Sequence, residues 1–328
     1  MRQTIRRSIT STTSTTTKIF DVVFKEFVAE KKAMNLAPST IDSYVQSYNM
    51  FLFYNQLPPQ TTTDDICPQQ VFYFINAMNE SGIKPTSVNH YLRDLRAFLY
   101  WCMAEERAYI RRFKISLVFA QEEQLKLFTN DELERLLETP HKNDTFVTWR
   151  TWAIVNWVLA TGNRASTICD IHISDIDFTE KEITLRHTKN KKAQMIPLSH
   201  TLEVALNNYA KIWNIYSQED GYLFPNVGAE KLTTNALRLS FANYCKSRGV
   251  SRTNIHGLRH NFAKGWVKNG GNMFVLQQVL GHSTLEMTRK YVRLFSEDIK
   301  ENYGQYTTLD TIKRGTSRTH CITKNKTN

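Results

Sequence analysis

Residues 256–291 read HGLRHNFAKGWVKNGGNMFVLQQVLGHSTLEMTRKY, a stretch rich in side chains that bind phosphate. His256 and Arg259 are three positions apart on a predicted helix, so both side chains leave the same face and could grip one anion. His282 and Tyr291 follow a break at Gly281, so only the fold can bring them together. The stretch therefore predicts an anion site assembled from several elements.

The same region is basic and nearly free of acids. The 55 residues between Glu230 and Glu286 contain no Asp or Glu, and the whole chain carries 42 Lys and Arg against 31 Asp and Glu, a formal net charge of +11. Because a carboxylate would repel a phosphate backbone, this pattern favours a nucleic-acid surface. A solvated basic face is the plainer alternative.

Two upstream segments add further cations. Arg164 lies in ATGNRAS, residues 160–166, and Lys189 lies in ITLRHTKNKKAQMIPLS, residues 183–199. The second segment predicts two short strands, Ile183 to His187 and Met195 to Leu198, around a polar turn.

Together these residues indicate phosphoryl transfer without a metal. Such a reaction needs neutralisation of the non-bridging oxygens, a nucleophile and a proton donor for the leaving oxygen, and guanidinium groups can replace Mg²⁺ in the first task. A tyrosine can be the nucleophile and conserve the ester energy in a phosphotyrosine. The candidate residues are Arg164, Lys189, His256, Arg259, His282 and Tyr291.

These segments resemble those of the tyrosine recombinases, of the phage integrase and Xer type, in the order of that family. Residues 35–51 and 86–101 also resemble its core-binding domain, so the resemblance covers about residues 18 to 295. The four matching boxes are ATGNRASTICDIHISDID (160–177), TKNKKAQMIPL (188–198), HGLRHNFA (256–263) and LGHSTLEMTRKY (280–291).

The resemblance implies a role for each candidate. Tyr291 would attack the scissile phosphate, giving a 3′-phosphotyrosine and a free 5′-hydroxyl. Arg164 and Arg259 would hold the non-bridging oxygens, and no cofactor is implied. Lys189 would protonate the 5′-oxygen. Lys191 and Lys192 lie on the same turn, and the choice of Lys189 rests on aligning the segment backwards from Pro197-Leu198. His256 and His282 would assist proton transfer and hydrogen bonding in the transition state.

Three nearby positions bear on this assignment. Thr167 stands where the family often has an acid, which affects the support of Arg164, and Asn261 stands where Thr or Ser is common. His260 is expected to be a buried, supporting histidine.

Four amphipathic patterns between residues 18 and 107 predict an all-α bundle, with Ser39 or Thr40 capping the second helix. We expect a two-domain, mainly α protein: an all-α, SAM-like core-binding domain and an α+β catalytic domain with a small antiparallel sheet. The bundle's large aromatics are expected in its core: Phe51, Phe53, Phe72, Phe74, Phe98 and Trp101. The expected divisions are a disordered basic arm (1–17), the core-binding domain (18–107), a linker (108–128), the catalytic domain (129–303) and a C-terminal tail (304–328).

The resemblance implies double-stranded DNA with inverted-repeat core sites as the partner, and a tetramer on two duplexes. Integration or excision of a mobile element is the expected task, and Xer-like resolution of DNA multimers is the alternative. The need for a directionality factor stays open. Five scattered cysteines without a C-x-x-C pair indicate a reduced, cytoplasmic protein, and no apolar run approaches the ~20 residues of a membrane span.

Three rivals remain. His256 and His260 have the spacing of a helical zinc pair, but Gly257 stands where such sites carry a catalytic Glu. A non-catalytic DNA-binding protein would not need every catalytic position filled. A type IB topoisomerase shares the tyrosine chemistry and differs in assembly, for which residues 296–314 offer a candidate exchange segment.

Overall fold

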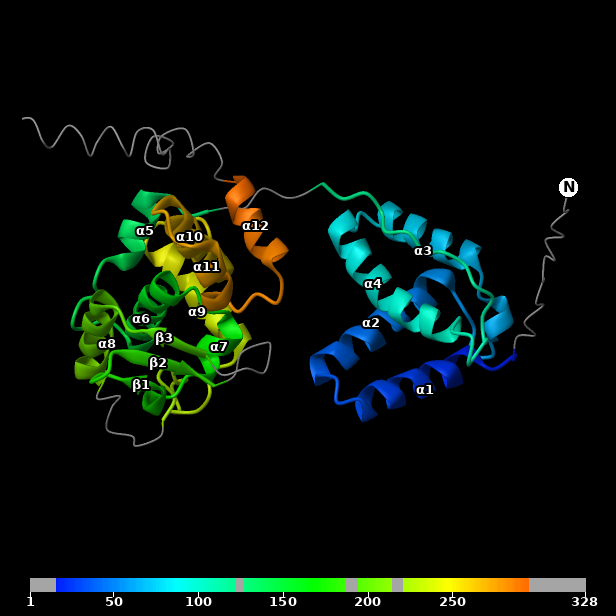
Figure 1. Cartoon of the computed structure of the whole chain (residues 1–328), viewed down its shortest axis with the longest axis horizontal. Helices are drawn as coiled ribbons and strands as arrows, with labels where there is room; N and C mark the ends of the chain where they lie inside the picture. Colours follow the sequence, from blue (N-terminus) through cyan, green and yellow to red (C-terminus); the bar gives the residue numbers. More distant parts are fainter. Residues whose placement is uncertain (1–15, 122–126, 187–193, 214–220, 295–328) are drawn as a thin grey trace, which may run out of the picture. The chain divides into compact units, whose positions relative to one another are not determined.

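The computed structural model describes residues 16–121, 127–186, 194–213 and 221–294. The chain divides into two compact units, Met1–Glu123 and Gln124–Asn328 (Figure 1). This division falls within residues 108–128, the segment predicted as a linker. Among the helices of these ranges, none combines the length and the apolar character that a bilayer span requires.

The first unit is the predicted bundle of four helices. Pro38, Pro68 and Pro85 each stand at the first helical position, where the missing N–H of proline costs no hydrogen bond. The expected cap at Ser39 or Thr40 is wrong, since the helix begins earlier, at Pro38, and its N-cap makes no side-chain bond. The elements are α1 (Phe20–Ala33), α2 (Pro38–Asn55), the 3₁₀ turn η1 (Thr63–Asp65), α3 (Pro68–Glu80) and α4 (Pro85–Cys102).

Aromatic rings fill the core of this bundle. Phe24 and Tyr48 stack with ring centroids 3.8 Å apart, and Phe98 meets both edge-on, at 5.0 and 5.8 Å. Phe27 and Phe51 are fully buried beside them. These contacts join α1, α2 and α4 and combine large apolar burial with favourable ring geometry.

Two of the aromatics predicted in the core lie outside it. Phe53 on α2 and Phe72 on α3 are 73% and 64% exposed, whereas Phe51 and Phe74 are buried. The reason is helical geometry, because positions two apart face different sides of a helix. The aromatic pairs in the sequence therefore contribute one ring to the core and one to the surface.

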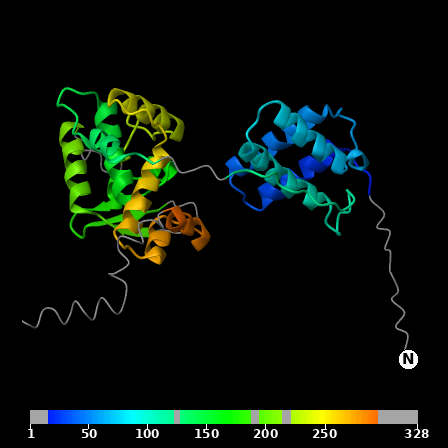
Figure 2. The ribbon, with the colours of Figure 1, turned by 90° about the horizontal axis from the view of Figure 1, so that it is seen from above.

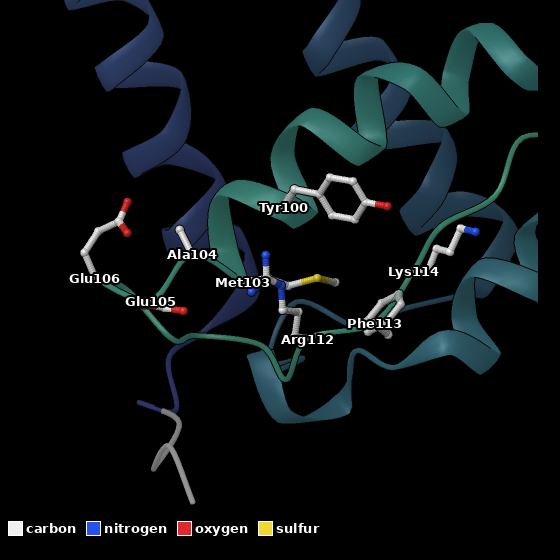
Figure 3. Close-up of a pocket in the computed structure, with 8 residues that line it drawn as sticks. All are labelled: Tyr100, Met103, Ala104, Glu105, Glu106, Arg112, Phe113 and Lys114. Carbon is white, nitrogen blue, oxygen red and sulfur yellow. The ribbon is translucent and has the colours of Figure 1, made fainter. Parts of the chain in front are cut away.

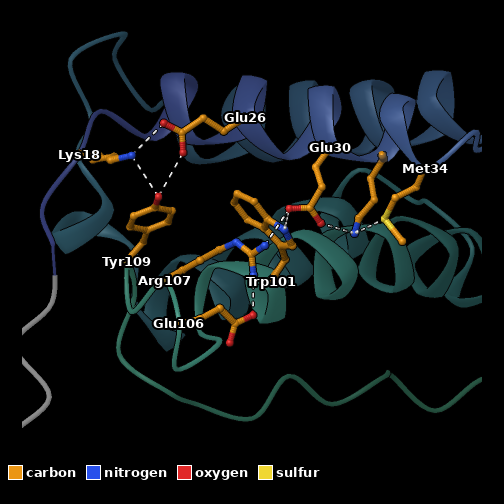
Figure 4. Close-up of polar contacts among 9 residues, drawn as sticks. Lys18, Glu26, Glu30, Met34, Trp101, Glu106, Arg107 and Tyr109 are labelled. Atoms are coloured by element: carbon orange, nitrogen blue, oxygen red, sulfur yellow. Dashed lines mark hydrogen bonds and ion pairs between the residues drawn. The ribbon is translucent and has the colours of Figure 1, made fainter.

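Polar contacts tie the chain after α4 back to α1 (Figure 4). Lys18 Nζ donates to Glu26 Oε1 at 2.8 Å and to the Tyr109 hydroxyl at 3.0 Å. Arg107 and the Trp101 indole N–H both donate to Glu30 Oε2, at 2.7 and 2.9 Å. Residues 107–109 are thereby held against the first helix.

The extended segment that follows also belongs to this unit. Ile110 and Ile115 are buried in its core. The amide of Asn89, on α4, donates to the Val118 carbonyl at 2.8 Å and accepts from the Val118 N–H at 2.9 Å. The first part of the predicted linker is therefore packed against the first unit, because its apolar side chains are buried in the core of that unit.

A pocket of about 790 Å³ lies between the end of α4 and the returning segment (Figure 3). Tyr100, Met103, Arg112 and Phe113 are among its lining residues. It contains none of the predicted catalytic residues.

The second unit has α6 at its centre. Trp157, Ile154 and Val155 on this helix are fully buried, and Arg150 donates to the Pro225 carbonyl at 2.6 Å. The helix packs against α5, α8, α9 and α10. The helices are α5 (Asn130–Leu137), α6 (Phe146–Thr161), α7 (Ala165–Asp170), η2 (Ile173–Asp175), α8 (His200–Trp213), α9 (Thr234–Ser247), α10 (Ile255–Lys268), α11 (Met273–Val279) and α12 (Leu285–Leu294).

A small antiparallel sheet of order β1-β2-β3 completes the unit, so the predicted fold class is confirmed. Ile183 of β2 pairs with Ile196 of β3, and both side chains are buried. The two predicted strands are present, each displaced by one or two residues, and β1 was missed because it has only two residues. The strands are β1 (Ile176–Asp177), β2 (Glu182–Leu185) and β3 (Gln194–Pro197).

The start of the second unit is fixed from α10. The Asn261 side chain accepts from the Phe128 N–H at 3.0 Å and donates to the Phe128 carbonyl at 2.8 Å. The amide thus pairs with both backbone groups of one residue through separate donor and acceptor atoms, whereas a Thr or Ser hydroxyl has a single oxygen for both roles. This contact explains why an asparagine is suited to position 261.

The last described helix, α12, lies at the edge of the second unit in both views (Figures 1 and 2).

Replacing Phe98 with alanine should lower the free energy of unfolding of the first unit by about 3 to 5 kcal/mol, because it leaves a cavity among packed rings. Amide hydrogen exchange of α1–α4 in the complete chain measures this. Phe53→Ala is the control, since an exposed ring should cost no more than about 0.5 kcal/mol. Equal losses in the two variants would contradict this description of the core.

Candidate active site

Arg259 is the buried centre of the site. Its side chain, on α10, is 2% exposed and donates to the Gly162 carbonyl at 2.7 Å and to the Leu280 carbonyl at 2.8 Å. These carbonyls belong to the residues that follow α6 and α11. One guanidinium therefore joins the ends of two helices to α10.

His282 is held by the same guanidinium. Its Nε2 lies 2.9 Å from Arg259 Nη2, and its Nδ1 lies 2.9 Å from the Thr288 hydroxyl. Because arginine only donates, Nε2 must accept, and Nδ1 carries the proton and donates to Thr288. Burial, followed by the charges of Arg259 and Arg164, lowers the pKa of His282 to about 4. The ring is neutral at pH 7.

Arg164 is the second cation of the site. It is the N-cap residue of α7, is half-buried, and donates from both terminal nitrogens to the Gly281 carbonyl at 3.4 Å. Burial and the neighbouring charge of Arg164 lower the pKa of Arg259 to about 10. Within the described ranges no carboxylate forms a salt bridge with either arginine. The pair therefore presents uncompensated positive charge.

Tyr291 lies beside both arginines. Its side chain, on α12, is 4% exposed, and its hydroxyl is 2.8 Å from His260 Nδ1. Burial raises the pKa of the hydroxyl, while the charges of Arg259 and Arg164 oppose the rise. The net direction is upward, so the phenol holds its proton at neutral pH.

His256 lies at the open side of the site. It is exposed, unlike Arg259, so the two residues that share a helix face differ in their access to solvent. Its ring centroid is 4.7 Å from that of His260. Desolvation, followed by the charges of Arg259 and Arg164, lowers the pKa of His256, which favours the neutral ring.

The structure thus brings together five of the six predicted residues, and Lys189 lies outside the described residues. His260 is half-buried and touches Tyr291 directly, which the expectation of a merely supporting histidine did not include. The sequence did contain a signal for this contact, because His260 follows His256 by four residues and therefore lies one turn along the same helix face. The five residues are Arg164, His256, Arg259, His282 and Tyr291.

In the described part of the chain, no group of three or more His, Cys, Asp or Glu side chains is arranged to hold a metal ion. His256 and His260 are neighbours on α10, and the described structure places no third ligand with them.

Gly162 allows α6 to end against this site. Its φ is +65°, and a Cβ there would lie 2.5 Å from the Phe262 ring and 2.8 Å from Leu280. Glycine is required both by the left-handed backbone and by the close packing. The turn aims the Gly162 carbonyl at Arg259.

Gly162→Ala should destabilise the second unit by more than the cost of a left-handed alanine, about 1 to 2 kcal/mol, because the methyl group also collides with Phe262. Gly82→Ala is the matched control: its φ is +72° and its Cβ would meet nothing within 4 Å. Hydrogen exchange of each variant's own unit provides the comparison. A smaller loss for Gly162→Ala would refute the collision.

Acidification should destabilise the second unit through His282. The pKa of this residue is 6.5 in its ordinary state and about 4 in the fold. The unfolded chain therefore binds a proton first as the pH falls from 6.5 to 4, and stability decreases over this window by roughly 3 kcal/mol.

Unfolding free energies between pH 7 and 4 test this, with wild type compared with His282→Asn. The variant should lose less stability on acidification, and the exposed control His141→Asn should match wild type. Parallel pH profiles for wild type and His282→Asn would contradict the assignment.

The sequence matches the phage integrase family over residues 126–298. It is 25% identical to the tyrosine recombinase XerD of Chlamydia trachomatis over 282 residues, which covers 83% of this chain and 90% of that protein. It is 27% identical to XerC of Staphylococcus aureus over 280 residues, covering 83% and 92%.

Solved structures share the fold. A lambda integrase dimer bound to a COC′ core site has a TM-score of 0.65 at 16% identity, covering 84% of this chain and 77% of that one. XerH bound to a palindromic difH substrate also has a TM-score of 0.65, at 20% identity, covering 84% and 82%. The family match spans more than half of the chain. The protein belongs to the phage integrase family and is a tyrosine recombinase, an enzyme that breaks and rejoins DNA strands.

Proposed function

We propose that this protein is a site-specific recombinase in which Tyr291 attacks the scissile phosphate of double-stranded DNA. The observation that carries the proposal is the place of the Tyr291 hydroxyl, beside Arg164 and Arg259 and with no carboxylate paired to either in the described structure. Burying a cation without a counter-charge is costly. A phosphate entering the site supplies that charge.

The reaction is a transesterification. Tyr291 Oη bonds to phosphorus, the bond from phosphorus to the 5′-oxygen breaks, and a 3′-phosphotyrosine and a free 5′-hydroxyl result. Arg164 and Arg259 hold the non-bridging oxygens, and their donors gain strength in a desolvated site. The ester energy stays in the phosphotyrosine, so attack by a 5′-hydroxyl reverses the step.

The remaining predicted residues support this step. Lys189 protonates the departing 5′-oxygen. His282 uses both ring nitrogens to fix Arg259 and Thr288, so we assign it to holding Arg259 in place and to hydrogen bonding rather than to proton transfer. His256 is exposed and neutral beside the arginines, suited to hydrogen-bond the phosphate.

Recombination requires a larger assembly, and we propose a tetramer that joins two duplexes at inverted-repeat core sites. A lambda integrase tetramer bound to a Holliday junction shares this fold, with a TM-score of 0.66 at 16% identity, which supports the proposal by analogy. The predicted exchange segment, residues 296–314, lies outside the described residues.

Integration or excision of a mobile element is the proposed task. A Tn1549 transposon integrase shares the fold over 92% of this chain and all of that one, with a TM-score of 0.65 at 18% identity. Xer-like resolution of DNA multimers is the second candidate, favoured by Xer relatives that match over most of their length. In either case we propose that the protein acts in the cytoplasm. A directionality factor would distinguish integration from excision.

Tyr291→Phe should abolish covalent attachment to DNA and leave DNA binding within about twofold of wild type, because only the nucleophilic oxygen is removed. Wild-type and variant proteins are expressed in cells and purified under denaturing conditions, and the attached DNA is sequenced. Tyr73→Phe, which alters an exposed tyrosine of α3, is the control and should keep the adduct.

Adducts at a few inverted-repeat sites are expected, and their location at element ends or at one chromosomal site separates the two tasks. Adducts in the Tyr291→Phe sample would refute the nucleophile. Adducts scattered along the genome would indicate a type IB topoisomerase instead.

A further inference from the structure

Attack by Tyr291 releases a proton that some group must accept. The phenol is protonated at rest, since burial raises its pKa. As Oη bonds to phosphorus, the O–H bond must break. A proton acceptor must lie within hydrogen-bond reach of Oη, about 2.6 to 3.2 Å.

We infer that His260 is this acceptor, a catalytic base for cleavage that the set of six predicted residues does not include. Its Nδ1 lies 2.8 Å from Tyr291 Oη. The inference rests on the proposed function, because it assigns a role within that reaction.

The other side chains around Tyr291 are excluded by their bonding. Arg164 and Arg259 carry protons already and have no lone pair to offer. The His282 ring lies parallel to Tyr291 with centroids 6.3 Å apart, and its two nitrogens are engaged by Arg259 and Thr288. His256 contacts the His260 ring rather than the hydroxyl, so among the described residues His260 is the acceptor that lies within hydrogen-bond distance of Tyr291 Oη.

The electrostatics of the site favour proton transfer to His260 when a phosphate is bound. Arg164 and Arg259 lie near the Tyr291 hydroxyl, and His256 contacts the His260 ring from the same helix. Before DNA binds, Arg164 and Arg259 leave two positive charges in the site with no described carboxylate paired to either. A bound phosphate offsets those charges and stabilises the imidazolium that forms during attack.

The proton balance closes in both directions. In cleavage, the Tyr291 proton moves to His260 Nδ1 as Oη bonds to phosphorus, and Lys189 gives a proton to the departing 5′-oxygen. In rejoining, the 5′-hydroxyl attacks the phosphotyrosine, its proton returns to Lys189, and His260 returns its proton to Oη. No metal, cofactor or other reactant enters.

The first test measures single-turnover formation of the covalent complex on a DNA site recovered from the adduct experiment. His260→Ala should reduce the rate about 100-fold or more, the usual contribution of a general base, and leave DNA affinity within about twofold. His260→Gln keeps a hydrogen-bond acceptor for Tyr291 but cannot take its proton, so it should be folded and equally slow. The exposed control His200→Ala should match wild type.

The second test separates a base from a positioning residue. Tyr291 is replaced with 3,5-difluorotyrosine, whose more acidic hydroxyl needs less help to lose its proton. If His260 is the base, the rate loss caused by His260→Gln should shrink to less than about tenfold in this background. An undiminished loss would overturn the inference and leave His260 a positioning role only.

A third measurement distinguishes the base from the acid. A substrate with sulfur in place of the bridging 5′-oxygen carries a leaving group that needs no proton. It should restore cleavage by Lys189→Ala and leave His260→Gln slow, whereas rescue of His260→Gln would assign His260 to the leaving group instead. Wild-type protein that forms no covalent complex would refute the proposed function itself. A wild-type rate in His260→Gln would refute this inference alone.

Discussion

The buried guanidinium of Arg259 is the interaction on which the second unit depends. It satisfies the carbonyls of Gly162 and Leu280, at the ends of α6 and α11, and fixes the His282 tautomer. Without it, the carbonyls of these buried residues would lose their hydrogen-bond donor, at a cost comparable to lost hydrogen bonds. The same group neutralises phosphate in the proposed reaction. Arg259 therefore serves both the stability of the unit and the proposed reaction. A mutation can separate these two roles only if the variant keeps the hydrogen bonds of Arg259.

A second consequence concerns charge. Arg164 lies close enough to help lower the pKa of Arg259, and no described carboxylate pairs with either. Like charges in a partly desolvated site repel, so the protein holds this arrangement with carbonyl dipoles rather than ions. The absence of Asp and Glu from residues 231–285 is consistent with this arrangement. A carboxylate nearby would stabilise the resting protein and compete with DNA for the same guanidinium groups.

Much of this could be read from the sequence, and the failures have physical causes. The four-helix pattern and two of the three strands follow from periodicity, and the five predicted residues that the described structure brings together were indicated by motifs that resemble those of the family. Predicting that Phe53 and Phe72 lie on the surface requires knowing which way each helix is rotated, and the aromatic residues alone do not give that rotation. The bond between His260 and Tyr291 spans 31 residues and depends on how α11 turns the chain towards α12. Which nitrogen of His282 is protonated depends on partners that only the fold supplies.

Two asparagine side chains hold the backbone at the two ends of the segment that connects the units, residues 118–128. Asn89 pairs with both backbone groups of Val118, and Asn261 does the same for Phe128. Ten Cα steps separate these anchors, which limits the tether to about 35 Å when fully extended. Under the proposed function both units bind one duplex, so binding by one unit holds the other at a high effective concentration near the DNA. The short connection therefore lets the affinity of the whole chain for DNA exceed that of either unit without any further contact.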